Sequence, residues 1–135
     1  MSRTDTDILI AGGGIAGLSA ALAFGRAGFR VILASPAPPV IAGDAAGSDL
    51  RSTAFLQPAQ ALFAEIGLWD ALAEDAVPLD GLRIVDSAGW PPEVRETREF
   101  RASDLGPEPF GWNLLNWRVL KGLTDVLRAM PEVEI

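Results

Sequence analysis

The chain has 135 residues, 49% of them hydrophobic, which suits a single domain with a sizeable core. Its formal net charge of −7, with no cluster of Lys or Arg, argues against a nucleic-acid partner and against simple electrostatic adhesion to anionic lipid. Cysteine and histidine are both absent, which excludes disulfides, thiol chemistry, Cys/His metal sites and histidine-based acid–base catalysis. Demanding chemistry would therefore have to come from a cofactor.

The first predicted unit is a β-strand, a glycine-rich turn, a helix and a second strand. We expect the strands over Asp7–Ala11 and Val31–Ala34, and the helix over Ile15–Ala27. The turn Gly12–Gly17 has the spacing G-x-G-x-x-G. A glycine pattern of this kind between a strand and a helix predicts a dinucleotide site in a parallel α/β fold.

Each residue of this pattern has a physical role in that prediction. Gly12 allows a sharp turn off the strand, Gly14 lets a pyrophosphate approach the backbone, and Gly17 lets the helix lie close to the strands. The free amides of the first helical turn, including those of Ile15 and Ala16, would face the phosphates. The alternative is a glycine-rich turn that binds no ligand.

The apolar run at 8–24 could be mistaken for a signal sequence or a membrane span. Asp5 and Asp7 precede it where a signal peptide carries positive charge, and glycines interrupt it. We therefore interpret the run as a buried strand and helix, and we expect a soluble, cytoplasmic protein.

The next segments are irregular and then helical. Proline and glycine mark a long loop over Ser35–Ser48. Pro58 suits the first position of a helix that ends at Gly67, and a short helix is expected over Trp69–Glu74.

After Pro78 the pattern changes to an antiparallel pair of strands, expected over Leu82–Asp86 and Val94–Arg101. Asn116 is a candidate N-cap for a helix that ends near Pro131. The last residues, Glu132–Ile135, begin a further strand, which favours a chain that is part of a longer protein.

Several segments, in this order, resemble the N-terminal third of FAD-dependent class A (aromatic-ring) monooxygenases. Within that class the resemblance is greatest to the ubiquinone-biosynthesis hydroxylase family. The segments are Ile8–Ala34, Arg51–Ala54, Leu62–Trp69, Leu82–Asp86 and Phe110–Asn113 followed by Asn116.

The resemblance implies a Rossmann-like βαβ FAD-binding fold with the start of an inserted antiparallel substrate sheet. The FAD-binding βαβ portion and its helices would span 1–78, the inserted sheet 79–110, and the return to the FAD-binding domain 111–135. FAD would be the cofactor, NAD(P)H the reductant and oxygen the oxidant. The substrate would be a small aromatic molecule. If it is polyprenylated, peripheral membrane contact would come from segments outside this chain.

The resemblance also assigns individual residues. Arg51 matches an arginine that approaches the FAD pyrophosphate, and a solvated arginine at the end of a loop is the alternative. Asn116 aligns with a polar residue that reaches the flavin, and a helix cap is the alternative. Ser35 stands where an acidic residue usually binds the adenosine ribose, so the loss of that contact is expected to cost about 1–3 kcal/mol of affinity. The adjacent residues Pro36–Pro39 include no arginine that would bind the 2′-phosphate of NADP, so FAD is favoured over NADP.

No catalytic side chain or metal ligand can be named from the sequence, and this chain alone is expected to hydroxylate nothing. Two other functions stay open. One is an FAD-dependent reductase or oxidase of the same fold, and the other is a dinucleotide-binding module without catalysis.

Overall fold

The structure, a computed structural model, describes residues 5–135 and begins with the predicted βαβ unit. Strands β1 (Ile8–Ala11) and β2 (Val31–Ala34) are parallel, and helix α1 (Ile15–Arg26) connects them. A third parallel strand, β8 (Val133–Glu134), pairs with β2 and gives the order β1-β2-β8. The expected α/β fold, its first helix and its parallel strands are confirmed.

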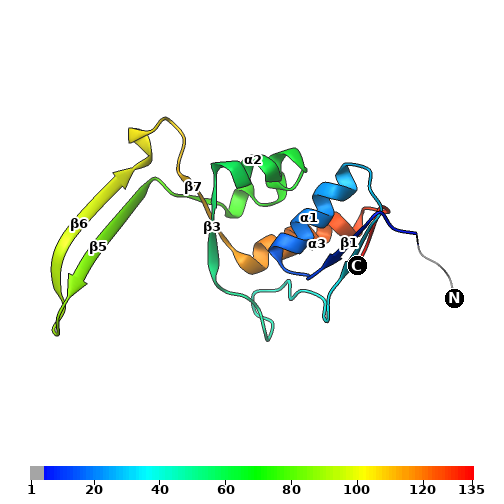
Figure 1. Ribbon diagram of the computed structural model, residues 1–135, viewed down its shortest axis with the longest axis horizontal. Helices are drawn as coiled ribbons and strands as arrows, with labels where there is room; N and C mark the ends of the chain where they lie inside the picture. Colours follow the sequence, from blue (N-terminus) through cyan, green and yellow to red (C-terminus); the bar gives the residue numbers. More distant parts are fainter. Residues whose placement is uncertain (1–4) are drawn as a thin grey trace.

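Helix α1 lies against the parallel sheet, and helix α3 (Asn116–Arg128) packs beside α1 (Figure 1). The apolar run at 8–24 is divided between β1 and α1, as the sequence predicts. Within residues 5–135, none of the helices has the length and apolar character needed to cross a membrane.

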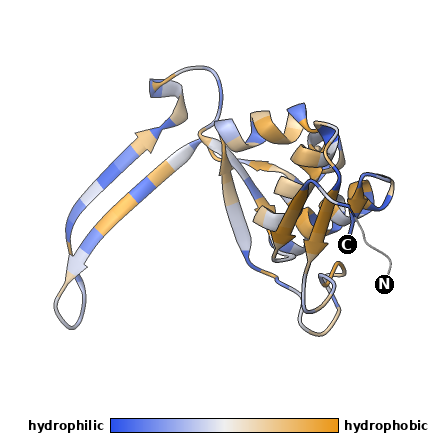
Figure 2. Cartoon of the chain, turned by 45° about the vertical axis from the view of Figure 1, so that its right-hand side comes forward, coloured by the Kyte–Doolittle hydropathy of each residue, from blue (hydrophilic) through white to orange (hydrophobic). Residues whose placement is uncertain are grey.

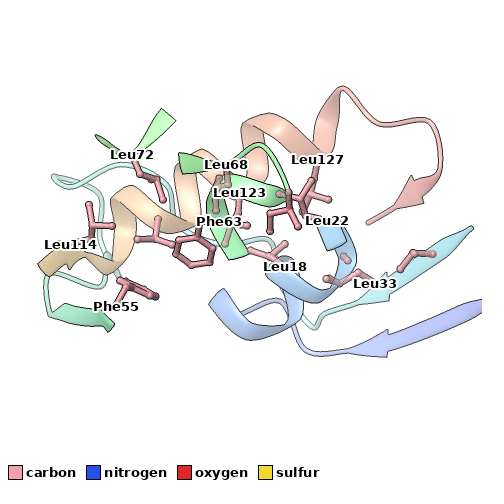
Figure 3. Packing of buried hydrophobic residues seen from close by; sticks show 14 residues of the cluster. Leu18, Leu22, Leu33, Phe55, Phe63, Leu68, Leu72, Leu114, Leu123 and Leu127 are labelled. Carbon is pink, nitrogen blue, oxygen red and sulfur yellow. The ribbon is translucent and has the colours of Figure 1, made fainter. Parts of the chain in front are cut away.

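The hydrophobic core lies mainly between these helices and the segment after α2 (Gln57–Glu65) (Figure 3). Leucines from three parts of the chain are fully buried, and each such side chain contributes about 1.5–3 kcal/mol by leaving water. They are Leu18 and Leu22 on α1, Leu123 and Leu127 on α3, and Leu68 and Leu72 after α2.

A second, antiparallel sheet has the order β3-β7-β4 and was not predicted. Strand β3 (Ser52–Leu56) pairs with β7 (Gly111–Leu115) along its whole length, and β4 (Val77–Pro78) adds a short third strand. Each of the first two strands runs directly into a helix, β3 into α2 and β7 into α3. Because no turn residue separates strand from helix, the sequence pattern shows only the helix.

The segment after β3 follows the prediction with small shifts. Helix α2 begins at Gln57, so Pro58 is its second residue rather than its first. Gly67 has φ +72° and ends the helix as expected. The predicted short helix is instead two 3-10 turns, η1 (Trp69–Ala71) and η2 (Ala73–Asp75).

Strands β5 (Gly81–Ala88) and β6 (Glu93–Arg101) form a long antiparallel hairpin that projects from the rest of the molecule (Figures 1 and 2). The antiparallel pairing is confirmed, although both strands are longer than predicted. Almost every residue of the hairpin is exposed. Its assignment to a substrate domain, and the division of the chain at 78 and 110, stay predictions.

Candidate functional site

The amino-terminal end of α1 is the first part of the candidate site. Gly12 has φ +123°, a conformation that favours glycine, and its amide donates to the Ala34 carbonyl at 2.8 Å. The first amide bonded within the helix is that of Leu18, which donates to the Gly14 carbonyl. No side chain caps α1, and no acidic residue lies in its first turn. This end of the helix therefore presents its positive dipole without an acid to neutralise it.

The three glycines of the motif have different surroundings. A Cβ on Gly17 would lie 1.9 Å from the Gly12 carbonyl oxygen, so packing of the protein itself requires glycine there. A Cβ on Gly14 would meet no atom within 4 Å, and the backbone at Gly14 has φ −82°. The space above Gly14 is therefore open, and nothing within the described residues explains why a side chain is absent.

Ser35 follows the last residue of β2 and lies against the glycine turn. A Cβ on Gly13 would approach the Ser35 Oγ to 2.6 Å. Ser35 can therefore lie this close to the turn because residue 13 is glycine, a residue that the sequence analysis did not single out. The Ser35 hydroxyl donates to the Ala37 carbonyl at 2.8 Å and is exposed. The structure thus places Ser35 beside the glycine motif, as the sequence position predicts.

The pairing of β3 with β7 brings two other candidate residues together. Ser52 pairs with Leu115, so the residue before β3, Arg51, lies beside the first residue of α3, Asn116. The Asn116 amide donates to the Arg51 carbonyl at 2.8 Å. A sheet that the sequence analysis missed is therefore the reason that these two predicted residues are neighbours.

The side chain of Arg51 is bound by a carboxylate that the sequence analysis also missed. Its Nε and Nη2 donate to the two carboxylate oxygens of Asp49, each at 2.8 Å. These hydrogen bonds, and then one from Asn116, hold the pKa of Asp49 well below its usual range. The pair also raises the pKa of Arg51. The only feature of the sequence that indicated this pair is the opposite charge of Asp49 and Arg51, two positions apart.

The prediction that Asn116 is an N-cap is wrong. Leu115 occupies the N-cap position, and no side chain caps α3. The first amides of α3 instead donate to backbone carbonyls, Asn116 to Arg51 and Trp117 to Asp49. The Asn116 side chain is thereby free to donate from Nδ2 to Asp49 at 3.0 Å and to accept from the Thr53 hydroxyl at 2.6 Å.

The loop between β2 and β3 connects the two parts of the candidate site. It starts at Ser35, beside the glycine motif, and ends at Asp49 and Arg51. Figure 1 shows it running past the amino-terminal ends of α1 and α3. A Cβ on Gly43 would lie 2.9 Å from the Trp117 ring, so the middle of the loop packs against the first turn of α3.

Known proteins show the family to which this arrangement belongs. The sequence profile described as "FAD binding domain" matches residues 7–78, more than half of the chain. The chain belongs to the FAD binding domain family. The residues matched for the FAD binding domain include the glycine motif, Ser35, the loop and Arg51.

Relatives of this FAD binding domain chain are longer proteins. Ubiquinone hydroxylase UbiL of Rhodospirillum rubrum is 39% identical over 80 residues, which are 59% of this chain and 18% of UbiL. Similar solved structures include p-nitrophenol 4-monooxygenase PnpA of Pseudomonas putida DLL-E4 (TM-score 0.67, 23% identity) and the flavin-dependent monooxygenase PieE in complex with FAD and substrate (0.68, 24%). The match covers 100% and 99% of this chain, but only 31% and 24% of those structures. At these identities the likeness shows the fold.

The geometry fits FAD at the amino-terminal end of α1. The open space at Gly14 and the uncapped first turn form a cradle that a Cβ would fill. Backbone amides at such a helix end bind phosphate groups in many folds. The residues at Gly12–Gly17 therefore offer the open space and the unpaired backbone amides that a phosphate group requires.

Proposed function

We propose that this chain is the N-terminal, FAD-binding part of a flavin-dependent monooxygenase that hydroxylates an aromatic ring. The observation that carries the proposal is the open, uncapped amino-terminal end of α1, where Gly14 has no neighbour within 4 Å of an added Cβ. Membership of the FAD binding domain family and the fold shared with flavin-dependent monooxygenases support it.

In this proposal the residues of the chain bind and orient the adenosine and pyrophosphate of FAD. The amides of Ile15, Ala16 and Gly17 donate to phosphate oxygens, helped by the dipole of α1. Ser35 gives one hydrogen bond to the adenosine ribose, and Arg51 neutralises a phosphate charge. The flavin, when bound, supplies the redox chemistry of the hydroxylation. None of the contacts described above assigns a side chain to the aromatic ring of the substrate.

The test of this cradle is the substitution Gly14→Val. The backbone at Gly14 has φ −82° and ψ −178°, an extended conformation that valine adopts readily, so the side chain fills the cradle without backbone strain. We expect FAD binding, measured by quenching of flavin fluorescence, to be lost while the circular dichroism spectrum is retained. Gly106→Val is the matched control, because a Cβ there also meets no atom within 4 Å. Equal FAD affinity in Gly14→Val and the unsubstituted chain would refute the proposal.

For the substrate, we propose a ubiquinone precursor, with NAD(P)H as the reductant, in a cytoplasmic protein that contacts the inner face of a membrane through other segments. The support is the 39% identity with UbiL over 80 residues, which are 59% of this chain. The experiment is product analysis on the complete protein with NADH or NADPH, offering a polyprenylated phenol beside a water-soluble phenol. Hydroxylation of the water-soluble phenol alone would overturn the ubiquinone assignment and leave the monooxygenase proposal intact.

A further inference from the structure

The Arg51 guanidinium is held along one edge, and no hydrogen bond from residues 5–135 occupies the other. Nε and Nη2 both donate to Asp49, at 2.8 Å each, in a side-on bidentate pair. The rest of the planar fork, Nη1 and the second hydrogen of Nη2, is not used by this pair. The Arg51 side chain is 83% exposed, so the unused edge is accessible to a ligand.

Asp49 is itself fixed at the start of α3. Its carboxylate accepts from Asn116 Nδ2 at 3.0 Å and from the Arg51 backbone amide at 3.2 Å. Its carbonyl accepts from the Trp117 amide at 3.2 Å. Asn116 is 8% exposed and is held in turn by the Thr53 hydroxyl. The Asp49 carboxylate is therefore held by several donors, and it in turn holds the exposed side chain of Arg51.

We propose that Asp49 is a positioning residue, which holds the side-on edge of Arg51 so that the opposite edge is ready for the pyrophosphate of FAD. The identity of the ligand rests on the function proposed above. An exposed arginine that is mobile in the free protein must lose its rotamer freedom when it binds, and an arginine already held by Asp49 has lost that freedom beforehand. The bidentate use of the free edge by a phosphate also requires a defined orientation of the fork.

Electrostatics alone predicts the opposite effect. A carboxylate beside a diphosphate repels it, and a carboxylate bound to Arg51 competes with it for the guanidinium. Asp49, however, occupies only one edge of the fork, and its charge is compensated by donors from Arg51 and Asn116. The two effects have opposite signs, so a single affinity measurement separates them.

The first experiment is a double-mutant cycle with FAD as the titrant. We expect Asp49→Ala to weaken FAD binding about 2- to 10-fold, the range set by ordering one long side chain. In an Arg51→Ala background we expect the same substitution to cause no loss of affinity, because there is no guanidinium left to position. If Asp49→Ala does not fold, Asp49→Asn keeps the shape, removes the charge and serves in the same cycle.

Three results would contradict the inference. Tighter FAD binding by Asp49→Ala would mean that the carboxylate competes with the ligand. Unchanged binding would mean that Asp49 does not position Arg51 for it. An equal loss with and without Arg51 would mean that Asp49 acts through the fold rather than through the guanidinium.

A second experiment reads the position of Arg51 without FAD. We expect the Arg51 Nε–H signal in a nitrogen-15 correlation spectrum to be resolved, and to move to the position of free arginines in Asp49→Ala. Arg83, whose Nε donates to Glu99 at 2.7 Å on the hairpin, is the internal control and should not move. An Arg51 Nε–H signal that keeps its position in Asp49→Ala would refute the positioning of Arg51 by Asp49. Failure of the unsubstituted chain to bind FAD would instead overturn the proposed function and the ligand assigned here.

Discussion

Asn116 and Asp49 are 67 positions apart in the sequence, yet the Asn116 Nδ2 donates to the Asp49 carboxylate at 3.0 Å. This hydrogen bond joins the end of the long loop to the start of α3. It exists because β3 pairs with β7, which aligns the residues that precede and follow those strands. The relationship connects the unpredicted sheet with the candidate cofactor site.

Loss of the Asn116 side chain is expected to destabilise the fold. Asn116→Ala removes the partner of the part-buried Thr53 hydroxyl and one of the donors to the Asp49 carboxylate, which should lower the free energy of unfolding by about 1–3 kcal/mol. Urea denaturation measures it. Asn113→Ala is the matched control, since Asn113 makes one exposed bond to Ser52, and its effect should be under about 1 kcal/mol. Similar losses in both variants would contradict the role of Asn116.

Substitution of Gly17 should destabilise the fold more than substitution of Gly14. Gly17→Ala places a Cβ 1.9 Å from the Gly12 carbonyl oxygen, and the backbone must move to accept it. We expect the free energy of unfolding to fall by about 3 kcal/mol or more. Gly14→Ala meets open space and should cost about 1 kcal/mol or less. Thermal melts of the two variants make the comparison, and equal melting temperatures would argue against the tight contact at Gly17.

Asp49 should make stability depend on acid pH. Because its pKa is lower in the folded protein than in the unfolded chain, the unfolded chain takes up the proton first as the pH falls. The stability that Asp49 provides is therefore complete above about pH 5 and is lost progressively below about pH 4. Urea denaturation of the unsubstituted chain and Asp49→Asn across this range tests it.

The difference between those two proteins should shrink toward zero as the pH falls. Asp7, whose pKa is also lowered, by Arg30, is unchanged in the variant and so serves as an internal control for general acid effects. A difference that stays constant down to the lowest pH would show that the charge of Asp49 does not contribute.

Ser35→Asp should tighten FAD binding. An acidic side chain at the end of β2 gives the charged contact to the adenosine ribose that serine lacks, worth about 1–3 kcal/mol, or roughly a 5- to 150-fold change in the dissociation constant. Ser35→Asn has a similar shape without the charge and should have a smaller effect. Calorimetric titration with FAD measures both. Weaker binding by Ser35→Asp than by Ser35→Asn would mean that Ser35 does not face the ribose.

Local signals made the βαβ unit and the hairpin predictable. The strand, the glycine motif and the second strand lie within residues 7–34, so hydrophobic periodicity and turn chemistry specify them without long-range information. The same holds for the hairpin, whose strands are separated by a short turn containing Gly89. The positions of Gly14, Gly17 and Ser35 followed from the same local pattern.

The second sheet and the Asp49–Arg51–Asn116 network depend on contacts that no local pattern records. The strands β3 and β7 are separated by more than 50 residues, and each has few residues before its helix begins. Asn116 has the side chain of a helix cap, but the carbonyls of Arg51 and Asp49 already accept the amides that it would cap. Asp49 became visible as part of the site only when the pairing of these strands was known.

The hairpin is attached to the core through a narrow connection. The Ala102 amide donates to the Asp80 carbonyl at 2.8 Å, so the chain leaves and re-enters the body of the protein at neighbouring points. Residues 81–101 lie between these points and contribute no fully buried side chain. This segment is thus an exchangeable cassette, which evolution or an engineer can lengthen, shorten or replace while the parallel sheet and its helices keep their packing.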